Sequence, residues 1–285
     1  RKREEPHGNK LVYFQPEIKY GHVVYQFGLI GNCQISALIS AHGSIDWLCL
    51  PRPDSPPVFG KILDQDGGHF SIHPSVPLSE TTSKQHYIPN TNILVTTISL
   101  PNGDAYQITD FCPRFLQYGR VYRPTALFRI VEPLSGTPSI RVCCNPVSGW
   151  DKTPVGFVRG NSHFRYDIRG EYLRLLTDMP LTYLCQETPV ALTSKMYFAL
   201  TWGIGIEDDL VKVSHEFLDQ TIKYWRIWVK HCSIPVLYQE EVIRSALALK
   251  LHCYEDTGAI LAALTTSLPE EPGGPRNCQY QAVAR

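Results

Sequence analysis

The sequence predicts a mainly β chain, in which an antiparallel β-sandwich comes first and helices follow. Up to about residue 205, short β-rich runs alternate with turn segments that are rich in proline and glycine. Such a pattern is typical of a sandwich rather than of βαβ units. From about residue 210 the apolar side chains recur at the spacing of a helix. The 285 residues, 43% of them apolar and 19% charged, are globular in composition and suffice for one large domain or two ordinary ones.

Two turns in the first part of the chain predict hairpins. Gly43 lies between two apolar runs, and Asn102-Gly103 lies between two more. An Asn-Gly pair in this setting predicts a tight turn in which both central residues have positive φ. The expected strands are, in order, residues 35–40, 44–50, 94–100, 105–111, 125–131, 139–144, 155–159, 163–168, 172–176 and 195–202.

The first expected helix covers residues 214–231. Its apolar side chains recur at i, i+3 and i+4, with Ser214 as the expected N-cap and Pro235 beyond its end. Trp225 and Trp228 lie three residues apart on this apolar face. We therefore expect them in the core or at a domain interface rather than in a stack for sugar.

A second helix is expected over residues 237–254. Its apolar face includes Val242, Leu249 and Cys253, and Gly258 is the expected C-terminal stop. A helix with a wide apolar face must bury that face against another element. The two helices therefore favour the beginning of a helical domain after the sandwich.

Charge and cysteine usage exclude several classes of protein. Twenty-seven basic residues balance twenty-seven acidic ones, so no basic excess favours nucleic acid or an anionic membrane. No apolar run reaches the roughly 20 residues that span a bilayer, and the charged residues 1–10 do not resemble a secretory signal. Nine scattered cysteines without a Cys-x-x-Cys pair predict no metal site. Together with the absence of an Asn-x-Ser/Thr sequon, they favour the cytoplasm, with a secreted, disulfide-bonded chain as the alternative.

Several segments resemble those of glycoside hydrolase family 15, the bacterial-type glucoamylases and trehalases, and they follow one another in the same order as in that family. The resemblance begins in the family's trehalase-like N-terminal domain and covers about residues 22–277. The segments that carry it are Phe27-Gly28-Leu29-Ile30-Gly31-Asn32-Cys33, residues 43–52, Asp54-Ser55-Pro56, Ile108-Thr109-Asp110-Phe111, Tyr224-Trp225-Arg226, residues 242–250, Gly258-Ala259-Ile260, residues 265–271 and residues 273–277.

This resemblance implies a β-sandwich followed by an (α/α)6 barrel. It divides the chain into a charged N-terminal tail (1–21), a trehalase-like N-terminal β-sandwich domain (22–213), a linker helix (214–235) and the truncated start of the barrel (236–285). The family hydrolyses α-glucosidic bonds with inversion, using one glutamic acid as general acid and a second as general base. Both glutamates are expected beyond residue 285, so this chain by itself is expected to be inactive. The substrate, trehalose or the non-reducing end of an α-glucan, stays open, as does the oligomeric state, and no cofactor is implied.

The resemblance also implies weak substrate-binding roles for Arg276 and Tyr280. Tyr280 matches a position that faces glucose in the family. The neighbouring Cys278 and Gln279 stand where the family has Trp and Asp, so the sugar-binding pattern is incomplete. No catalytic residue is assigned to the chain.

Other carboxylates are better explained by structure than by catalysis. The adjacent pair Glu270-Glu271 points in divergent directions and is expected to belong to a loop. Glu207-Asp208-Asp209 and Glu240-Glu241 precede the expected helices, where negative charge complements the helix dipole. Residues 46–54, with Asp46, Trp47, Arg52 and Asp54, could form a platform for sugar but are more simply scaffold. Two further interpretations of the chain's function stay open. The chain could be a non-catalytic carbohydrate-binding or scaffolding module, or a fragment without a function of its own.

Overall fold

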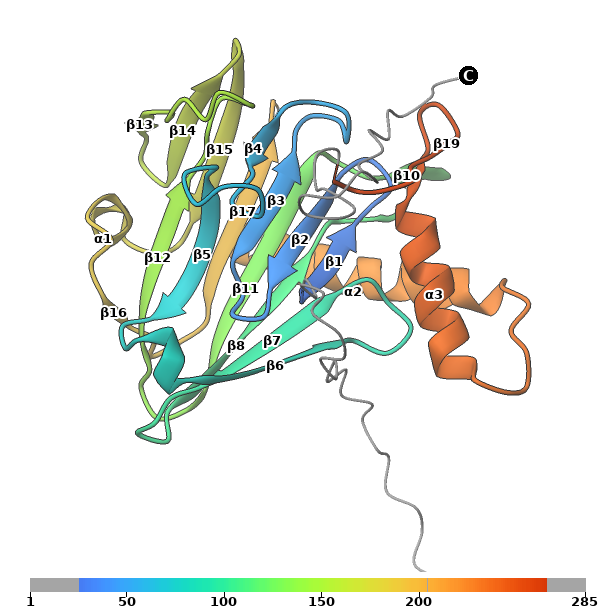
Figure 1. Cartoon of the computed structure of the whole chain (residues 1–285), viewed down its shortest axis with the longest axis horizontal. Helices are drawn as coiled ribbons and strands as arrows, with labels where there is room; N and C mark the ends of the chain where they lie inside the picture. The colour runs from blue at the N-terminus through green and yellow to red at the C-terminus, as the bar shows by residue number, and fades with distance from the viewer. Residues whose placement is uncertain (1–25, 204, 266–285) are drawn as a thin grey trace, which may run out of the picture.

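The computed structural model describes residues 26–203 and 205–265. Two antiparallel β-sheets face one another, and two helices, α2 and α3, lie outside the sandwich, α3 next to β1 (Figure 1). The chain is mainly β, as the sequence predicts.

The first sheet contains the N-terminal strands. Its order is β1-β2-β3-β5-β12-β16, and β4 pairs with β3. The strands are β1 (Phe27–Gly31), β2 (Ser36–Ser40), β3 (Ile45–Cys49), β4 (Pro57–Phe59), β5 (His69–Pro74), β12 (Ser139–Asn145) and β16 (Val190–Ala191).

The second sheet has eight strands in the order β13-β14-β15-β17-β11-β8-β7-β6. They are β6 (Thr82–Tyr87), β7 (Leu94–Ser99), β8 (Ala105–Phe111), β11 (Ala126–Ser135), β13 (Phe157–Arg159), β14 (His163–Ile168), β15 (Glu171–Thr177) and β17 (Met196–Trp202). Smaller elements complete the described chain: η1 (Leu78–Glu80), α1 (Leu181–Cys185), and the two-stranded pairs β9 (Phe115–Gln117) with β10 (Arg120–Tyr122) and β18 (Cys253–Tyr254) with β19 (Ala259–Ile260).

The core lies between the two sheets and contains side chains from both. Phe70 of β5 meets Phe198 of β17 in an edge-to-face contact, with ring centroids 6.1 Å apart. The guanidinium of Arg129 on β11 is fully buried, pairs with Asp110 of β8 at 2.7 Å, and donates to the carbonyl of Phe70 at 2.8 Å. It also donates to the carbonyl of Gly43. A buried arginine therefore ties the second sheet to the first.

Both expected hairpins are present. β2 pairs with β3 and β7 pairs with β8, each antiparallel. One detail of the prediction is wrong: Gly103 has φ +90°, but Asn102 does not have a positive φ. The backbone N–H groups of Gly103 and Leu100 bond to the carbonyls of Leu100 and Asp104, so one left-handed glycine suffices to close this wider turn.

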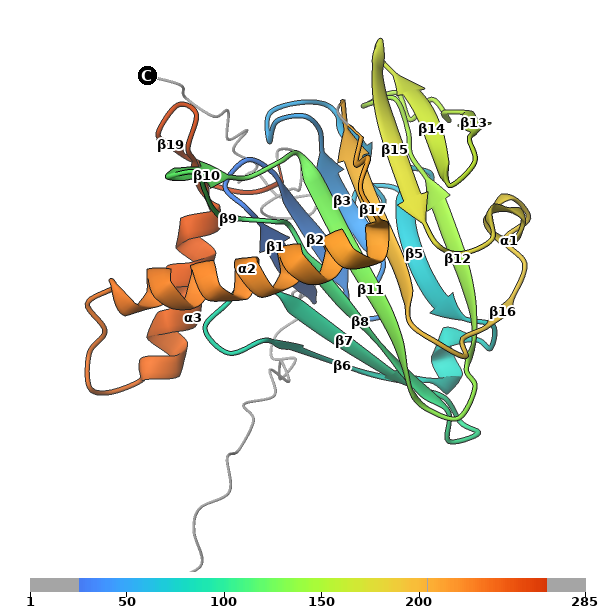
Figure 2. The same cartoon turned by 180° about the vertical axis from the view of Figure 1, so that it is seen from behind.

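Helix α2 (Leu210–Lys230) lies across the outer face of the second sheet, over β8, β11 and β17 (Figure 2). The expected N-cap is wrong, because Asp209 caps the helix by accepting from the backbone N–H of Lys212 at 2.7 Å. Ser214 lies inside the helix, where its hydroxyl donates to the carbonyl of Leu210. Phe217 anchors the helix among aromatic rings of the sandwich.

Helix α3 (Gln239–Leu251) packs against α2. Their shared cluster contains Trp225, which is fully buried, together with Leu247 and Leu251. Trp225 and the partly buried Trp228 thus lie in an interface between elements, as expected. The helix ends at Leu251 rather than at the expected residue 254. The expected stop, Gly258, has a φ of +72° and lies in the turn between β18 and β19.

Several elements have weak sequence signals and were not expected. β5 carries His, Ser and His on alternate positions, and β6 is an edge strand of mostly polar residues. β1 is a short run in which two of the five residues are glycines. In the described residues, no helix is both long enough and apolar enough to cross a membrane.

Candidate functional site

The sequence-predicted sugar-binding residues Arg276 and Tyr280 lie outside the described residues, as do Cys278 and the pair Glu270-Glu271. The structure does describe the segment that leads toward them. After α3, the β18–β19 hairpin turns back over the sandwich, and the chain passes β3. There the indole N–H of Trp47 donates to the carbonyl of Leu264 at 2.8 Å.

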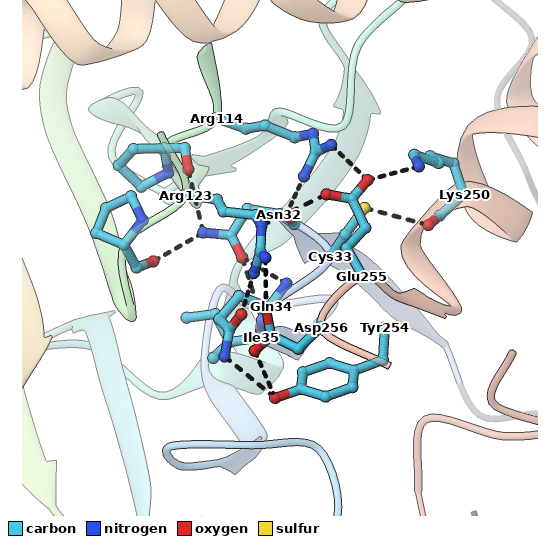
Figure 3. Close-up of polar contacts among 12 residues, drawn as sticks. Asn32, Cys33, Gln34, Ile35, Arg114, Arg123, Lys250, Tyr254, Glu255 and Asp256 are labelled. Carbon is cyan, nitrogen blue, oxygen red and sulfur yellow. Dashed lines mark hydrogen bonds and ion pairs between the residues drawn. The ribbon is translucent and has the colours of Figure 1, made fainter. Parts of the chain in front are cut away.

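We call the region where the β18–β19 hairpin and the end of α3 meet the sandwich the junction. Its centre is an ion pair between the sandwich and the hairpin. Arg114 lies just after β8 and is 1% exposed. Its guanidinium donates to Glu255 Oε1 at 2.6 Å and to the carbonyl of Asn32 at 2.7 Å (Figure 3). Lys250, at the end of α3, donates to the same Glu255 oxygen at 2.7 Å. One carboxylate therefore receives cations from both sides of the junction.

The electrostatics keep Glu255 ionised. Burial alone would raise the pKa of its carboxyl, but the hydrogen bonds and charges of Arg114 and Lys250 outweigh burial and lower the pKa below its ordinary value. A general acid needs a raised pKa so that it holds a proton near neutral pH. Glu255 is therefore an anchor and not a proton donor.

A second set of contacts runs parallel to the first. Arg123 donates to Asp256 at 2.5 Å and also to the side-chain oxygen of Gln34. Tyr254 donates its hydroxyl to the other oxygen of Asp256 at 2.9 Å and accepts from Gln34 at 3.3 Å (Figure 3). The hydrogen bond from Arg123 is the main reason that the pKa of Asp256 is lowered. Arg123 and Gln34 thus hold the C-terminal end of β18 and the turn that follows it.

The conformation of the turn at residues 32–35 places the side chain of Gln34 and the carbonyl of Asn32 at the junction. Asn32 is fully buried, and its side-chain oxygen accepts from the backbone N–H groups of Gln34 and Ile35, both at 3.1 Å. Cys33 adopts a left-handed conformation with φ +67° and points its thiol at the carbonyl of Lys250, 3.2 Å away. Burial raises the pKa of the Cys33 thiol to about 11, so this sulfur is a packing group and not a nucleophile.

The residues weighed as a sugar platform serve other contacts. Trp47 is 1% exposed, and its ring packs near that of Trp150. Arg52 forms a bidentate pair with Asp54 at the surface and lies over the ring of Tyr254. Asp46 is buried on the outer face of the first sheet and accepts from Ser44 at 2.5 Å. The structure thus brings Trp47 and Arg52 to the junction but leaves Asp46 outside it.

Sequence reasoning did not single out Arg114 or Glu255. Neither belongs to a short motif, and the two side chains meet across 141 positions of the chain. The available signal was a lone arginine directly after a β-rich, apolar run, next to Cys112-Pro113. Such an arginine is ordinarily assigned to the surface.

Comparison with known families and proteins agrees with this architecture. The family model described as "Trehalase-like, N-terminal" matches residues 19–169. A trehalase of Thermoplasma volcanium is 31% identical over 289 residues, covering 97% of this chain and 46% of that protein. A trehalase of Mycolicibacterium smegmatis is 31% identical, and the match covers 90% of this chain and 42% of that protein. A trehalase of Thermoplasma acidophilum is 33% identical, and the match covers 86% of this chain and 42% of that protein.

The chain therefore spans less than half the length of these curated relatives. The matched family model begins before β1 and ends in the turn between β14 and β15, so it covers most of the sandwich. The order of the landmarks, the fold and the similarity along nearly the whole chain agree, and the chain belongs to the trehalase-like family related to glycoside hydrolase family 15.

Proposed function

We propose that this chain is the N-terminal portion of an inverting glycoside hydrolase that acts on an α-glucosidic bond. The relatives are named trehalases, so trehalose is the substrate we test first, with the non-reducing end of an α-glucan second. Inversion would need two carboxyl groups roughly 6.5–9.5 Å apart on either side of the scissile bond. Arg276 and Tyr280 would contribute to the sugar pocket, and the reaction would need no cofactor.

Within that enzyme, the described residues act as a rigid support that positions the segment that follows them. The observation that carries this role is the ion pair between Arg114 and Glu255, supported by the bond from Trp47 to Leu264. These contacts fix the path of the chain directly before the segment that contains Arg276 and Tyr280. A sugar pocket requires its side chains within a fraction of an ångström of their working positions, and rigid supporting elements supply that precision.

The helices support the proposed division of the chain. We assign residues 22–213 to the sandwich domain, 214–235 to a linker helix and 236–285 to the start of an (α/α)6 barrel. Apolar side chains next to and on α3 remain exposed, among them Val236 at 87%, Leu249 at 66% and Ile260 at 74%. Further barrel helices would cover such a surface, because large exposed apolar patches mark interfaces.

We further propose that the 285-residue chain alone does not hydrolyse trehalose. The junction carboxylates Glu255 and Asp256 are held ionised by their cationic partners, so neither offers a proton to a leaving oxygen. General acid assistance alone contributes about 10²–10⁴-fold to rate.

Eight of the cysteines lie in the described residues and all eight are free thiols, which agrees with a cytoplasmic location.

The test measures glucose release from trehalose and from maltotriose by the purified chain, against a boiled sample. We expect no release that scales with protein concentration. Release that does scale would overturn the inactivity. If Glu255→Gln leaves such release unchanged, the anchoring role of Glu255 is overturned as well.

A further inference from the structure

The outer face of the first sheet carries a groove, lined by both polar and apolar side chains, that the proposed function does not use. The groove has a volume of about 500 Å³, within the roughly 300–1,000 Å³ of small-molecule sites. Its lining includes residues of β3, β5 and β12. These three strands are neighbours in the first sheet (Figure 1). The arginine and glutamate of the junction are not among its lining residues.

The register of the strands sets polar side chains in rows across the groove. Phe70 and Ile72 of β5 point into the core, so the alternate residues His69, Ser71 and His73 point outward. His73 lies opposite Arg141 of β12. Three neighbouring strands therefore present polar groups to one concave surface.

Two polar atoms in this groove have no hydrogen-bond partner among the residues that the structure describes. The side-chain oxygen of Ser71 is buried without a partner, and the whole residue is only 6% exposed. The Nδ1 atom of His42, on the turn between β2 and β3, is also buried and unpartnered. A buried polar group left unsatisfied lowers the stability of the folded state, so native proteins retain such groups where something pairs with them.

The remaining lining groups are both donors and acceptors. Asp46 accepts from Ser44, and in the described residues no other side chain hydrogen-bonds to its carboxylate. Lys61 and Arg141 add cationic donors. Burial lowers the pKa of His69 to about 4, so its imidazole is neutral near pH 7 and both donates and accepts.

One edge of the groove is apolar. Pro74, Val76, Pro77 and Leu78 form this edge, where β5 leads into η1. Pyranose rings present hydroxyl groups at their edges, which need donors and acceptors together, and C–H groups on their faces, which pack on apolar surface.

An inorganic anion needs donors alone and would be repelled by the Asp46 carboxylate. No set of three or more His, Cys, Asp and Glu side chains in the described part of the chain is arranged to hold a metal ion.

From these observations we propose that the groove over β3, β5 and β12 binds a small saccharide, with Ser71 and Asp46 as hydrogen-bonding groups. This site would let the sandwich hold a sugar without cleaving it. The proposal does not require that the chain belong to an active hydrolase.

The test is a calorimetric or NMR titration of the whole 285-residue chain with glucose, maltose and trehalose, and separately with inorganic phosphate. We expect at least one saccharide to bind with a Kd of about 1 mM or tighter. Ser71→Ala should weaken that binding about 2- to 12-fold, the value of one neutral hydrogen bond. Asp46→Asn should weaken it by about tenfold or more, because its bonds are charge-assisted.

Matched controls separate binding from folding. Ser71→Ala removes a buried hydroxyl that has no partner, so its free energy of unfolding should be unchanged or slightly increased. Ser99→Ala, at an exposed position of β7 in the other sheet, should change neither binding nor stability. Saccharide binding that Ser71→Ala and Asp46→Asn leave intact would place the site elsewhere and overturn the proposal. Binding of phosphate alone, or of none of these probes, would overturn it as well.

Discussion

Arg114 and Glu255 approach to 2.6 Å although 141 positions separate them in the chain. The arginine side chain is 2% exposed and the glutamate side chain 24% exposed, so the pair lies at the inner edge of the junction. The guanidinium also lies over the ring of Tyr224 on α2, 4.8 Å from its centroid. Arg114 thus contacts the sandwich, helix α2 and the hairpin at once, which makes it the most informative position to change.

Arg114→Met should lower the free energy of unfolding by about 3 kcal/mol, near the low end for breaking a buried ion pair, because Lys250 still neutralises Glu255. Urea denaturation followed by tryptophan fluorescence measures the change. Arg52→Met is the matched control, since Arg52 pairs with Asp54 at the surface, where both side chains are nearly half exposed. That change should cost at most about 1 kcal/mol. Equal losses in the two variants would contradict the central role of Arg114.

Trp47→Phe should loosen residues 261–265 more than the rest of the chain. The substitution removes the hydrogen bond to Leu264, and hydrogen–deuterium exchange of this segment should become faster. The control is Trp150→Phe, at a half-exposed ring beside Trp47. If exchange in residues 261–265 does not respond to Trp47→Phe, the indole does not hold this segment.

Phe217→Ala should detach α2 from the second sheet. The Phe217 ring lies 5.1 Å from the centroid of Phe115 and 5.6 Å from that of Phe128, so its removal leaves a gap among aromatic groups. A loss of about 3 kcal/mol is expected, at the low end for such truncations because Phe217 is only partly buried. Thermal unfolding followed by circular dichroism measures it. Ile227→Ala, at an exposed position of the same helix, should cost far less.

His69 should make stability fall as the pH decreases from about 7 toward 4. Burial is the main cause of its lowered pKa of about 4, with Lys61 and His73 lowering it further and Glu187 opposing them. Below pH 6.5 the unfolded chain binds a proton at this histidine that the folded chain does not, so acid favours unfolding. In His69→Gln the free energy of unfolding should therefore decline less steeply over this range. The exposed His86→Gln is the control, and equal slopes in the two variants would contradict the assignment.

The two sheets illustrate what a local pattern determines. The hairpins around Gly43 and Gly103 were predictable because their turns and flanking apolar runs are local features of the chain. Helices α2 and α3 were predictable from periodicity, but their ends were not, since Asp209 and Ser214 are equally good capping residues by type. β5 and β6 escaped prediction because polar residues occupy one face of β5 and most of the edge strand β6.

The sequence by itself determined the family, the mainly β fold and the succession of a β region and two helices, because short-range patterns encode them. The tertiary structure alone decided that Arg114 meets Glu255 and that Trp47 reaches Leu264, because contacts between residues so far apart depend on the packing of whole elements. It also decided that Ser71 and Asp46 share a groove, since only the strand order β3-β5-β12 makes their outward faces one surface. Each of these side chains is unremarkable in the sequence, and its role follows from the neighbour that the fold supplies.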